Sequence, residues 1–181
     1  MKKLSFTLLA MAALPASAAA SSITIGSSLA EGCYVAAEDR DPSREAMDTC
    51  DRALREEALT SRDRVATHVN RGILHLNRAN LRAANADFDA ALALDPDEPE
   101  AWLNKAIGYA RLGHTAEALP LADKALELKT NRPALAYFVR ALALEDSGNI
   151  AAAYRDLKRA QSLEPTLKEA TVELSRFQVR R

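Results

Sequence analysis

The residues best able to do chemistry in this sequence are three histidines, two cysteines and several closely spaced acids. On a helix, His68 and His75 would share one face but lie about 10 Å apart along the axis. One metal ion cannot bind both rings at that separation without further ligands. His114 lies among turn-forming residues, and the pair Asp95 and Asp97 is typical of a helix cap. We therefore expect no metal site, no cofactor and no catalytic residue.

The sequence also lacks the short motifs that mark common enzyme classes. It contains no glycine-rich phosphate-binding loop, no HExxH zinc motif and no GxSxG nucleophile motif. No group of side chains meets the requirements of an active site, so we predict a protein that is not an enzyme. The formal charge of −1 is nearly balanced, which argues against nucleic acid as the partner.

The first 20 residues have the layout of a secretory signal peptide. Lys2 and Lys3 precede the apolar run Leu4–Leu14, and small residues then offer cleavage after Ala18 or Ala20. The run is shorter than the roughly 20 residues of a membrane span, although an uncleaved anchor is the alternative. We expect an exported protein, periplasmic in a double-membrane bacterium, without stable membrane insertion after cleavage. Loss of the two lysines would change its formal charge from −1 to −3.

Cys33 and Cys50 are the only cysteines in the chain. An exported protein folds in an oxidising compartment, so we predict a disulfide between them, worth about 3 kcal/mol. The alternative is a pair of buried free thiols. No CxxC motif is present to suggest redox catalysis.

The elements that position all these residues repeat with a period of 34 residues. Residues 65–98 read as two helices joined by a turn, and the pattern returns at residues 99–132 and, after one inserted residue, at 134–167. We expect residues 1–20 to be the leader, 21–64 to hold a lead-in and a degenerate helical hairpin, and 168–181 to form a capping helix with a polar outer face.

The degenerate hairpin is predicted from a helix at residues 28–38 and a second at residues 42–58. Asp41 and Pro42 suit the N-cap and first position of the second helix. Its segment EAMDTCDRAL, residues 45–54, aligns without gaps with EALPLADKAL, residues 117–126, in the second clear repeat. In that register Cys33 and Cys50 fall on neighbouring antiparallel helices.

This pattern of small and aromatic residues resembles the tetratricopeptide repeat family. Residues 99–129 match best, with Trp102, Ala106, Tyr109, Gly113, Ala118 and Ala125. The third repeat has Tyr137, Ala141, Gly148, Ala153, Ala160 and Pro165. The first departs from the pattern, because His68 and His75 replace aromatic residues. The resemblance implies an all-α fold, a right-handed solenoid of antiparallel helix pairs that binds a protein or peptide on its concave face.

The resemblance places the binding groove on the first helix of each pair. Its expected residues are Val69, Asn70, Ile73 and Asn77, then Leu103, Asn104, Ile107 and Arg111, then Phe138, Val139, Leu142 and Asp146. Asn70 and Asn104, one repeat apart, would bind the backbone of a peptide, and aliphatic residues would hold its side chains. Some family members clamp carboxylates with basic residues where this chain has Val69, Ile73 and Val139. We therefore expect no preference for acidic C-terminal tails.

Two alternatives to a peptide groove stay open. The apolar stripe could be filled by residues 21–28 of the same chain or by a second copy, because exposed apolar patches usually mark an interface. A homo-oligomer of that kind would make the protein a self-associating scaffold of the cell envelope. The asparagines could also serve packing alone.

Overall fold

The structure is a computed structural model that describes residues 28–178. These residues form nine α-helices and no strand, so the predicted all-α class is confirmed. The predicted signal peptide lies outside the described residues. The helices are α1 (Ser28–Glu38), α2 (Arg44–Glu56), α3 (Ser61–Asn77), α4 (Leu81–Leu94), α5 (Pro99–Arg111), α6 (Thr115–Glu127), α7 (Pro133–Asp146), α8 (Ile150–Leu163) and α9 (Lys168–Gln178).

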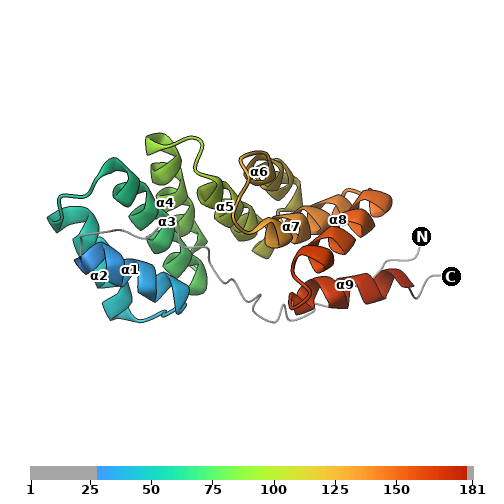
Figure 1. Cartoon of the computed structure of the whole chain (residues 1–181), viewed down its shortest axis with the longest axis horizontal. Coiled ribbons are helices and arrows are strands. Elements are labelled where there is room, and N and C mark those ends of the chain that lie inside the picture. The colour runs from blue at the N-terminus through green and yellow to red at the C-terminus, as the bar shows by residue number, and fades with distance from the viewer. Residues whose placement is uncertain (1–27, 179–181) are drawn as a thin grey trace.

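The helices pack as successive hairpins along the length of the molecule. Each hairpin pairs two consecutive helices, from α1 with α2 to α7 with α8, and the second helix of each pair contacts the first helix of the next. The chain therefore runs from α1 and α2 at one end to α8 and α9 at the other (Figure 1). The first helices also contact one another, α1 with α3, α3 with α5 and α5 with α7.

Small residues hold the paired helices close together. The core alanines Ala84, Ala106, Ala118 and Ala153 are fully buried, as the repeat pattern predicts. Gly72 of α3 lies against Phe88 of α4, and a Cβ atom at Gly72 would overlap with the ring. The predicted crossing of these two helices at a small residue is therefore correct.

The turns inside the hairpins use a left-handed residue after the first helix. Gly113 and Gly148 have φ of 75° and 82°, as expected for helix C-caps. In the two earlier hairpins Arg40 and Ala79 adopt the same conformation, with φ of 55° and 56°. The non-glycine residues carry a steric cost there, which fits the less typical sequence of the N-terminal half.

The start of α2 differs from the prediction. Ser43, not Asp41, is the N-cap, and its hydroxyl accepts a hydrogen bond from Ala46 N at 3.0 Å. Asp41 instead accepts hydrogen bonds from the amide and the hydroxyl of Ser43, at 2.8 and 2.9 Å. The Asp41 carboxylate thus orients the cap from outside the helix.

The predicted disulfide is present between α1 and α2. Cys33 and Cys50 are bonded, with their Cα atoms 4.8 Å apart and both residues fully buried. Glu57 adds a second tie, because its carboxylate accepts hydrogen bonds from Leu29 N and Ala30 N at the start of α1. The degenerate hairpin is therefore closed at two points.

Candidate functional site

The predicted groove residues lie on three helices, α3, α5 and α7, that contact one another in series. We call the surface that these residues define the inner face. In the full chain most of them are buried, each at most 3% exposed: Val69, Asn70, Ile73, Leu103, Asn104, Ile107, Phe138 and Val139. Asn77, Arg111 and Leu142 are partly exposed, and Asp146 is exposed at the end of α7.

The two asparagines of the inner face behave differently. Asn104 donates from Nδ2 to the carbonyl of Glu100 in its own helix at 2.8 Å. Asn70 Oδ1 is buried without a hydrogen-bond partner among the described residues, and so is Nδ2 of Asn77. A buried polar atom without a partner costs about 1–3 kcal/mol. The inner face of α3 therefore carries one acceptor and one donor whose hydrogen bonding is incomplete.

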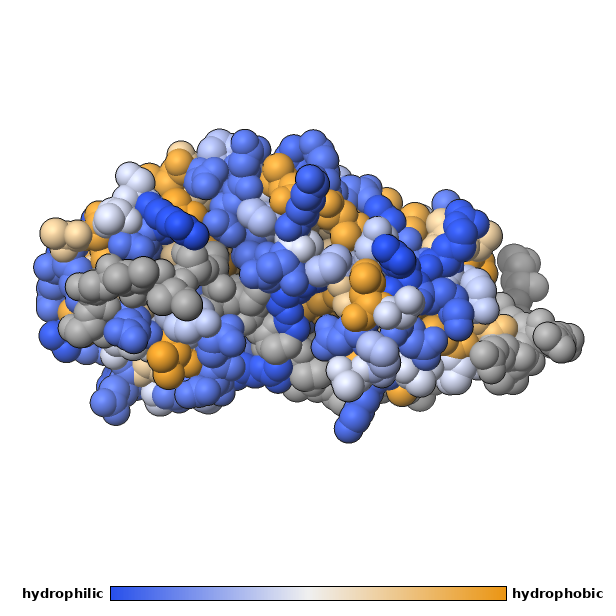
Figure 2. Space-filling view, viewed as in Figure 1, coloured by the Kyte–Doolittle hydropathy of each residue, from blue (hydrophilic) through white to orange (hydrophobic). Residues whose placement is uncertain are grey.

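The molecular surface offers no large apolar patch in the view of Figure 2. That face is mainly hydrophilic, and hydrophobic side chains appear on it in small separate groups. The most exposed large apolar residues are Leu94, Leu112, Ile150 and Val172, on different helices or turns. Within residues 28–178, no helix is long and apolar enough to cross a membrane.

A polar cluster lies under the second helix face of the first clear repeat. Asp87 of α4 is 3% exposed and accepts two hydrogen bonds from Arg71, at 2.9 and 2.6 Å. The ring of His68 lies 3.1 Å from the same carboxylate, and His75 Nε2 lies 3.8 Å from it. Both histidines are thus neighbours of one buried aspartate. They take interface positions, as the sequence indicates.

Electrostatics in this cluster favour a charged aspartate. Burial alone would raise the pKa of Asp87, but hydrogen bonds from His68 and Arg71 outweigh it and lower that pKa. Burial lowers the pKa of His75, which favours its neutral form. In the described part of the chain, no group of three or more His, Cys, Asp and Glu side chains has an arrangement able to hold a metal ion.

The third repeat contains the same buried pair, which the sequence analysis missed. Arg140 binds Asp156 through Nε and Nη2 at 2.7 and 2.9 Å, and its guanidinium lies 5.1 Å from the ring centre of Tyr137. The signal was available, because each aspartate follows its arginine by 16 residues. It was overlooked because polar residues on alternate helices read as surface charges.

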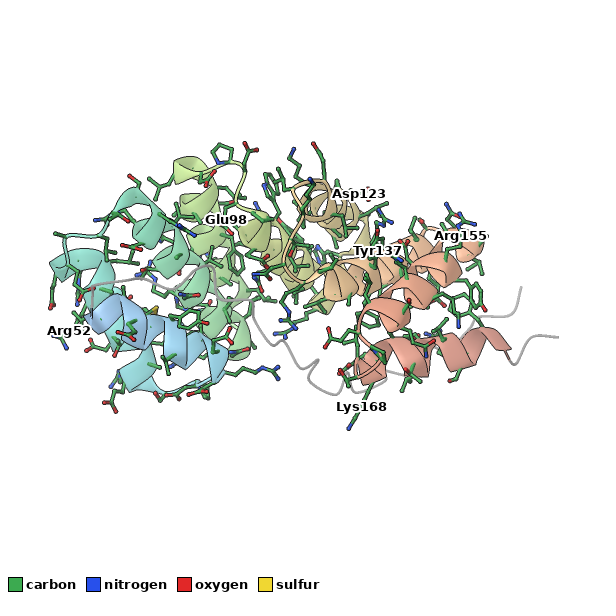
Figure 3. The ribbon with its side chains drawn as sticks, viewed as in Figure 1. Arg52, Glu98, Asp123, Tyr137, Arg155 and Lys168 are labelled. Carbon is green, nitrogen blue, oxygen red and sulfur yellow. A yellow bond between two sulfur atoms is a disulfide. The ribbon has the colours of Figure 1, made fainter. Side chains whose placement is uncertain are left out.

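A second ion pair links each hairpin to the next. Asp51 binds Arg71 at 2.7 Å, Asp123 binds Arg140 at 2.8 Å, and Asp89 contacts Lys105. Each aspartate lies on the second helix of one pair and each base on the first helix of the following pair. Figure 3 shows Asp123 of α6 beside Tyr137 of α7 at such a junction. Asp51 and Asp123 also align in the two segments that identified the degenerate hairpin.

A buried glutamate fastens the third hairpin to the second. Glu100, in the first turn of α5, is 2% exposed and accepts hydrogen bonds from Thr130 Oγ1 and Asn131 N, each at 2.8 Å. Burial raises its pKa despite these two bonds. The loop between α6 and α7 is held at the start of α5 by this carboxyl group.

The architecture thus defines the chain as an all-α helical-repeat protein, and comparisons with known proteins supply the family. The family model for the tetratricopeptide repeat matches residues 134–167. Similar solved structures include MamA MSR-1 C2, with 20% identity, TM-score 0.59 and coverage of 75% of this chain and 74% of that one. Another is the MamA RS-1 ArsTM double mutant, with 19% identity, TM-score 0.61 and coverage of 86% and 99%. No curated protein matches the chain. The chain is a tetratricopeptide repeat protein.

Proposed function

We propose that this chain is an exported, non-enzymatic module that binds a segment of another protein along the inner face of α3, α5 and α7. Tetratricopeptide repeats support a role in protein interaction. The observation that carries the choice of face is the pair of incompletely bonded amides on α3, Asn70 Oδ1 and Asn77 Nδ2. The backbone of a peptide offers both an N–H donor and a C=O acceptor, so it could satisfy both atoms.

The burial of the inner face sets a condition on this proposal. Leu103 and Ile107 are 1% and 2% exposed, so a ligand first meets the partly exposed rim formed by Asn77, Arg111 and Leu142. Deeper contact with the aliphatic residues requires the face to open further. Export and removal of residues 1–20 are part of the proposal, and the lysines and apolar run of the leader support them.

A site-specific cross-linking experiment tests the face without disturbing the core. A photo-cross-linking amino acid replaces Leu142 on α7 in one form of the full chain and Ile150, which is 49% exposed on α8, in a second. We expect a discrete protein adduct in cells from position 142 and none from position 150. Adducts from position 150 with none from position 142 would refute the inner face as the binding surface.

Fractionation of the same cells tests the compartment. We expect the chain in the periplasmic fraction, with a mature N-terminus at residue 19 or 21. A protein that keeps residues 1–20 and stays in the cytoplasm would contradict the export proposal.

The alternative function is a self-associating envelope scaffold. End-to-end stacking finds little support at the C-terminal end, because α9 exposes Lys168, Thr171, Ser175 and Arg176 there. Side-by-side association through Ile150 and Tyr154 of α8, which are 49% and 40% exposed, is a second route. Size-exclusion chromatography with light scattering, over a hundredfold range of concentration, separates the two functions. A mass that rises with concentration would favour the scaffold.

A further inference from the structure

The arginines that pack between the helices fall into two groups. Arg71 binds Asp87 and Asp51, and Arg140 binds Asp156 and Asp123, so each guanidinium has two carboxylate partners. The hydrogen bonds to these aspartates raise the pKa of Arg140, and they outweigh the effect of burial and raise that of Arg71. These two residues show how this fold normally accommodates a buried cation.

Arg111 belongs to the other group. It lies at the end of α5 on the rim of the inner face, and it is partly buried. Its guanidinium donates one hydrogen bond, from Nη1 to the carbonyl of Leu76 at 3.3 Å, and it forms no ion pair with a described residue. Burial lowers the pKa of Arg111, and the like charge of nearby Arg40 lowers it further. The environment of this cation therefore lacks the anion that Arg71 and Arg140 have.

A second donor without a partner lies at the same corner. Leu76, whose carbonyl Arg111 contacts, is followed directly by Asn77, and Nδ2 of Asn77 is buried without an acceptor. The corner thus brings together the guanidinium of Arg111 and the amide donor of Asn77, with the charge of Arg40 close by. We call these three residues the donor corner. It offers N–H groups and positive charge and lacks a paired acid.

We propose that the donor corner binds a carboxylate group of the protein segment that occupies the inner face. The proposal rests on the proposed function, because it names the chemistry of the ligand at one end of that face. A guanidinium can donate two parallel hydrogen bonds to the two oxygens of a carboxylate. The amide of Asn77 adds a third donor. The positive corner complements a negative ligand, and partial burial strengthens the attraction relative to the open surface.

This inference departs from one expectation drawn from the sequence. Val69, Ile73 and Val139, which occupy the places of a basic clamp, are apolar and buried, and that part of the expectation is correct. The cation of the inner face lies elsewhere, at Arg111 near the end of its helix. The carboxylate can come from an acidic side chain or from a chain terminus, and the experiment below distinguishes the two.

The first experiment uses acetate as the probe, because it needs no knowledge of the natural ligand. The Nε–H resonance of Arg111, assigned by its loss in Arg111→Lys, is followed by NMR in the full chain as sodium acetate is added. Sodium chloride at equal ionic strength is the reference. We expect a saturable shift with acetate that chloride does not reproduce. Equal responses to the two salts would overturn the proposal, and so would a stronger response to inorganic phosphate than to acetate.

The second experiment places the carboxylate on a peptide. The probes are Ac-Ala-Leu-Glu-Leu-Ala-NH2, the same peptide with Gln in place of Glu, and the Gln peptide with a free C-terminus. We expect the Glu peptide or the free acid to bind at least about tenfold more tightly than the neutral peptide. A preference for Glu identifies a side chain, and a preference for the free acid identifies a terminus. Equal affinities would overturn the inference while leaving peptide binding itself intact.

The variants separate this corner from general charge effects. Arg111→Gln should abolish the preference for the carboxylate and leave the affinity for the neutral peptide unchanged. Arg155→Gln, on exposed α8, removes the same charge and should leave the preference intact (Figure 3). If Arg155→Gln reduces the preference as much as Arg111→Gln does, net charge explains it and the donor corner is wrong. If acetate shifts Arg111 but no peptide binds, the proposed peptide function fails and the anion site stands alone.

Discussion

At the scale of single residues, Asp87 shows how the first clear repeat tolerates its unusual sequence. The repeat pattern expects aromatic side chains where this repeat has His68 and His75, and both histidines instead lie beside one buried carboxylate. Arg71 completes the environment with two hydrogen bonds to Asp87. A polar cluster thus replaces an aromatic one, and its stability depends on every member finding its partner.

Removal of the central carboxylate should therefore be costly. We expect Asp87→Asn to lower the free energy of unfolding by about 3 kcal/mol, because it leaves Arg71 without its buried partner. Asp123→Asn is the matched control, since that side chain is 53% exposed and should contribute less than about 1 kcal/mol. Urea unfolding of both variants measures the difference. Similar losses in the two variants would show that Asp87 has no special role.

The same cluster should make stability depend on pH. Burial lowers the pKa of His75 in the folded chain, so its contribution is fully present above about 6.5 and is lost as pH falls through the folded pKa. Asp87, whose pKa is also lowered, should lose stability in the same direction at more acidic pH. Glu100 acts in the opposite sense, because its raised pKa favours folding at low pH.

His75→Gln isolates the histidine from these other groups. We expect the wild-type chain to lose more stability than the variant between pH 7.5 and pH 5.5, measured by urea unfolding at each pH. Parallel pH profiles for the two proteins would contradict this assignment.

At the scale of the elements, the decisive feature is the point at which the two helices of a hairpin cross. Gly72 meets Phe88 at this point in the first clear repeat. Cys33 and Cys50, 17 residues apart, occupy the corresponding place in the degenerate hairpin, since Cys50 aligns with Ala122 and Phe88 follows Gly72 by 16 residues. A covalent bond thus replaces packing where the N-terminal hairpin departs most from the repeat pattern.

The glycine at this crossing should resist substitution. We expect Gly72→Ala to destabilise the chain by about 2 kcal/mol through overlap with Phe88, although alanine favours the helix by roughly 1 kcal/mol. Gly108→Ala is the control, because its new Cβ would meet the flexible end of Leu76 at 3.3 Å and gain the helix propensity. Thermal unfolding compares them. Equal effects would argue against a tight crossing at Gly72.

At the scale of the whole molecule, a stack of helix pairs transmits stability mainly between neighbours. The ion pairs from Asp51, Asp89 and Asp123 to bases on the following hairpin join successive units in this way. The disulfide acts only within α1 and α2. Its effect should therefore be local.

We expect the double variant Cys33→Ala, Cys50→Ala to lose about 3 kcal/mol of local stability in the N-terminal hairpin. Hydrogen exchange followed by mass spectrometry should show faster exchange in residues 28–57 and unchanged exchange in residues 134–163. Uniformly faster exchange across all helices would show that the chain unfolds as one unit.

Much of the fold could be predicted from the sequence, because its signals are local or periodic. Small residues at fixed spacing indicate where helices cross, and the two cysteines gave the disulfide. The N-cap of α2 was wrong by two residues, since Asp41 and Ser43 both have capping side chains and only the path of the turn selects between them. Periodicity places a helix, but it does not fix which of two adjacent polar residues closes it.

The site depends more on tertiary structure. The sequence by itself determined which residues share the inner face, because one side of a helix follows from its period of 3.6 residues. Only the packing of three hairpins decided that Val69 and Ile73 are buried, that Arg71 and Arg140 find aspartates, and that Arg111 finds none. Each of these outcomes depends on which side chains of separate repeats meet in space, and a repeat pattern is silent on that when its polar positions vary from copy to copy.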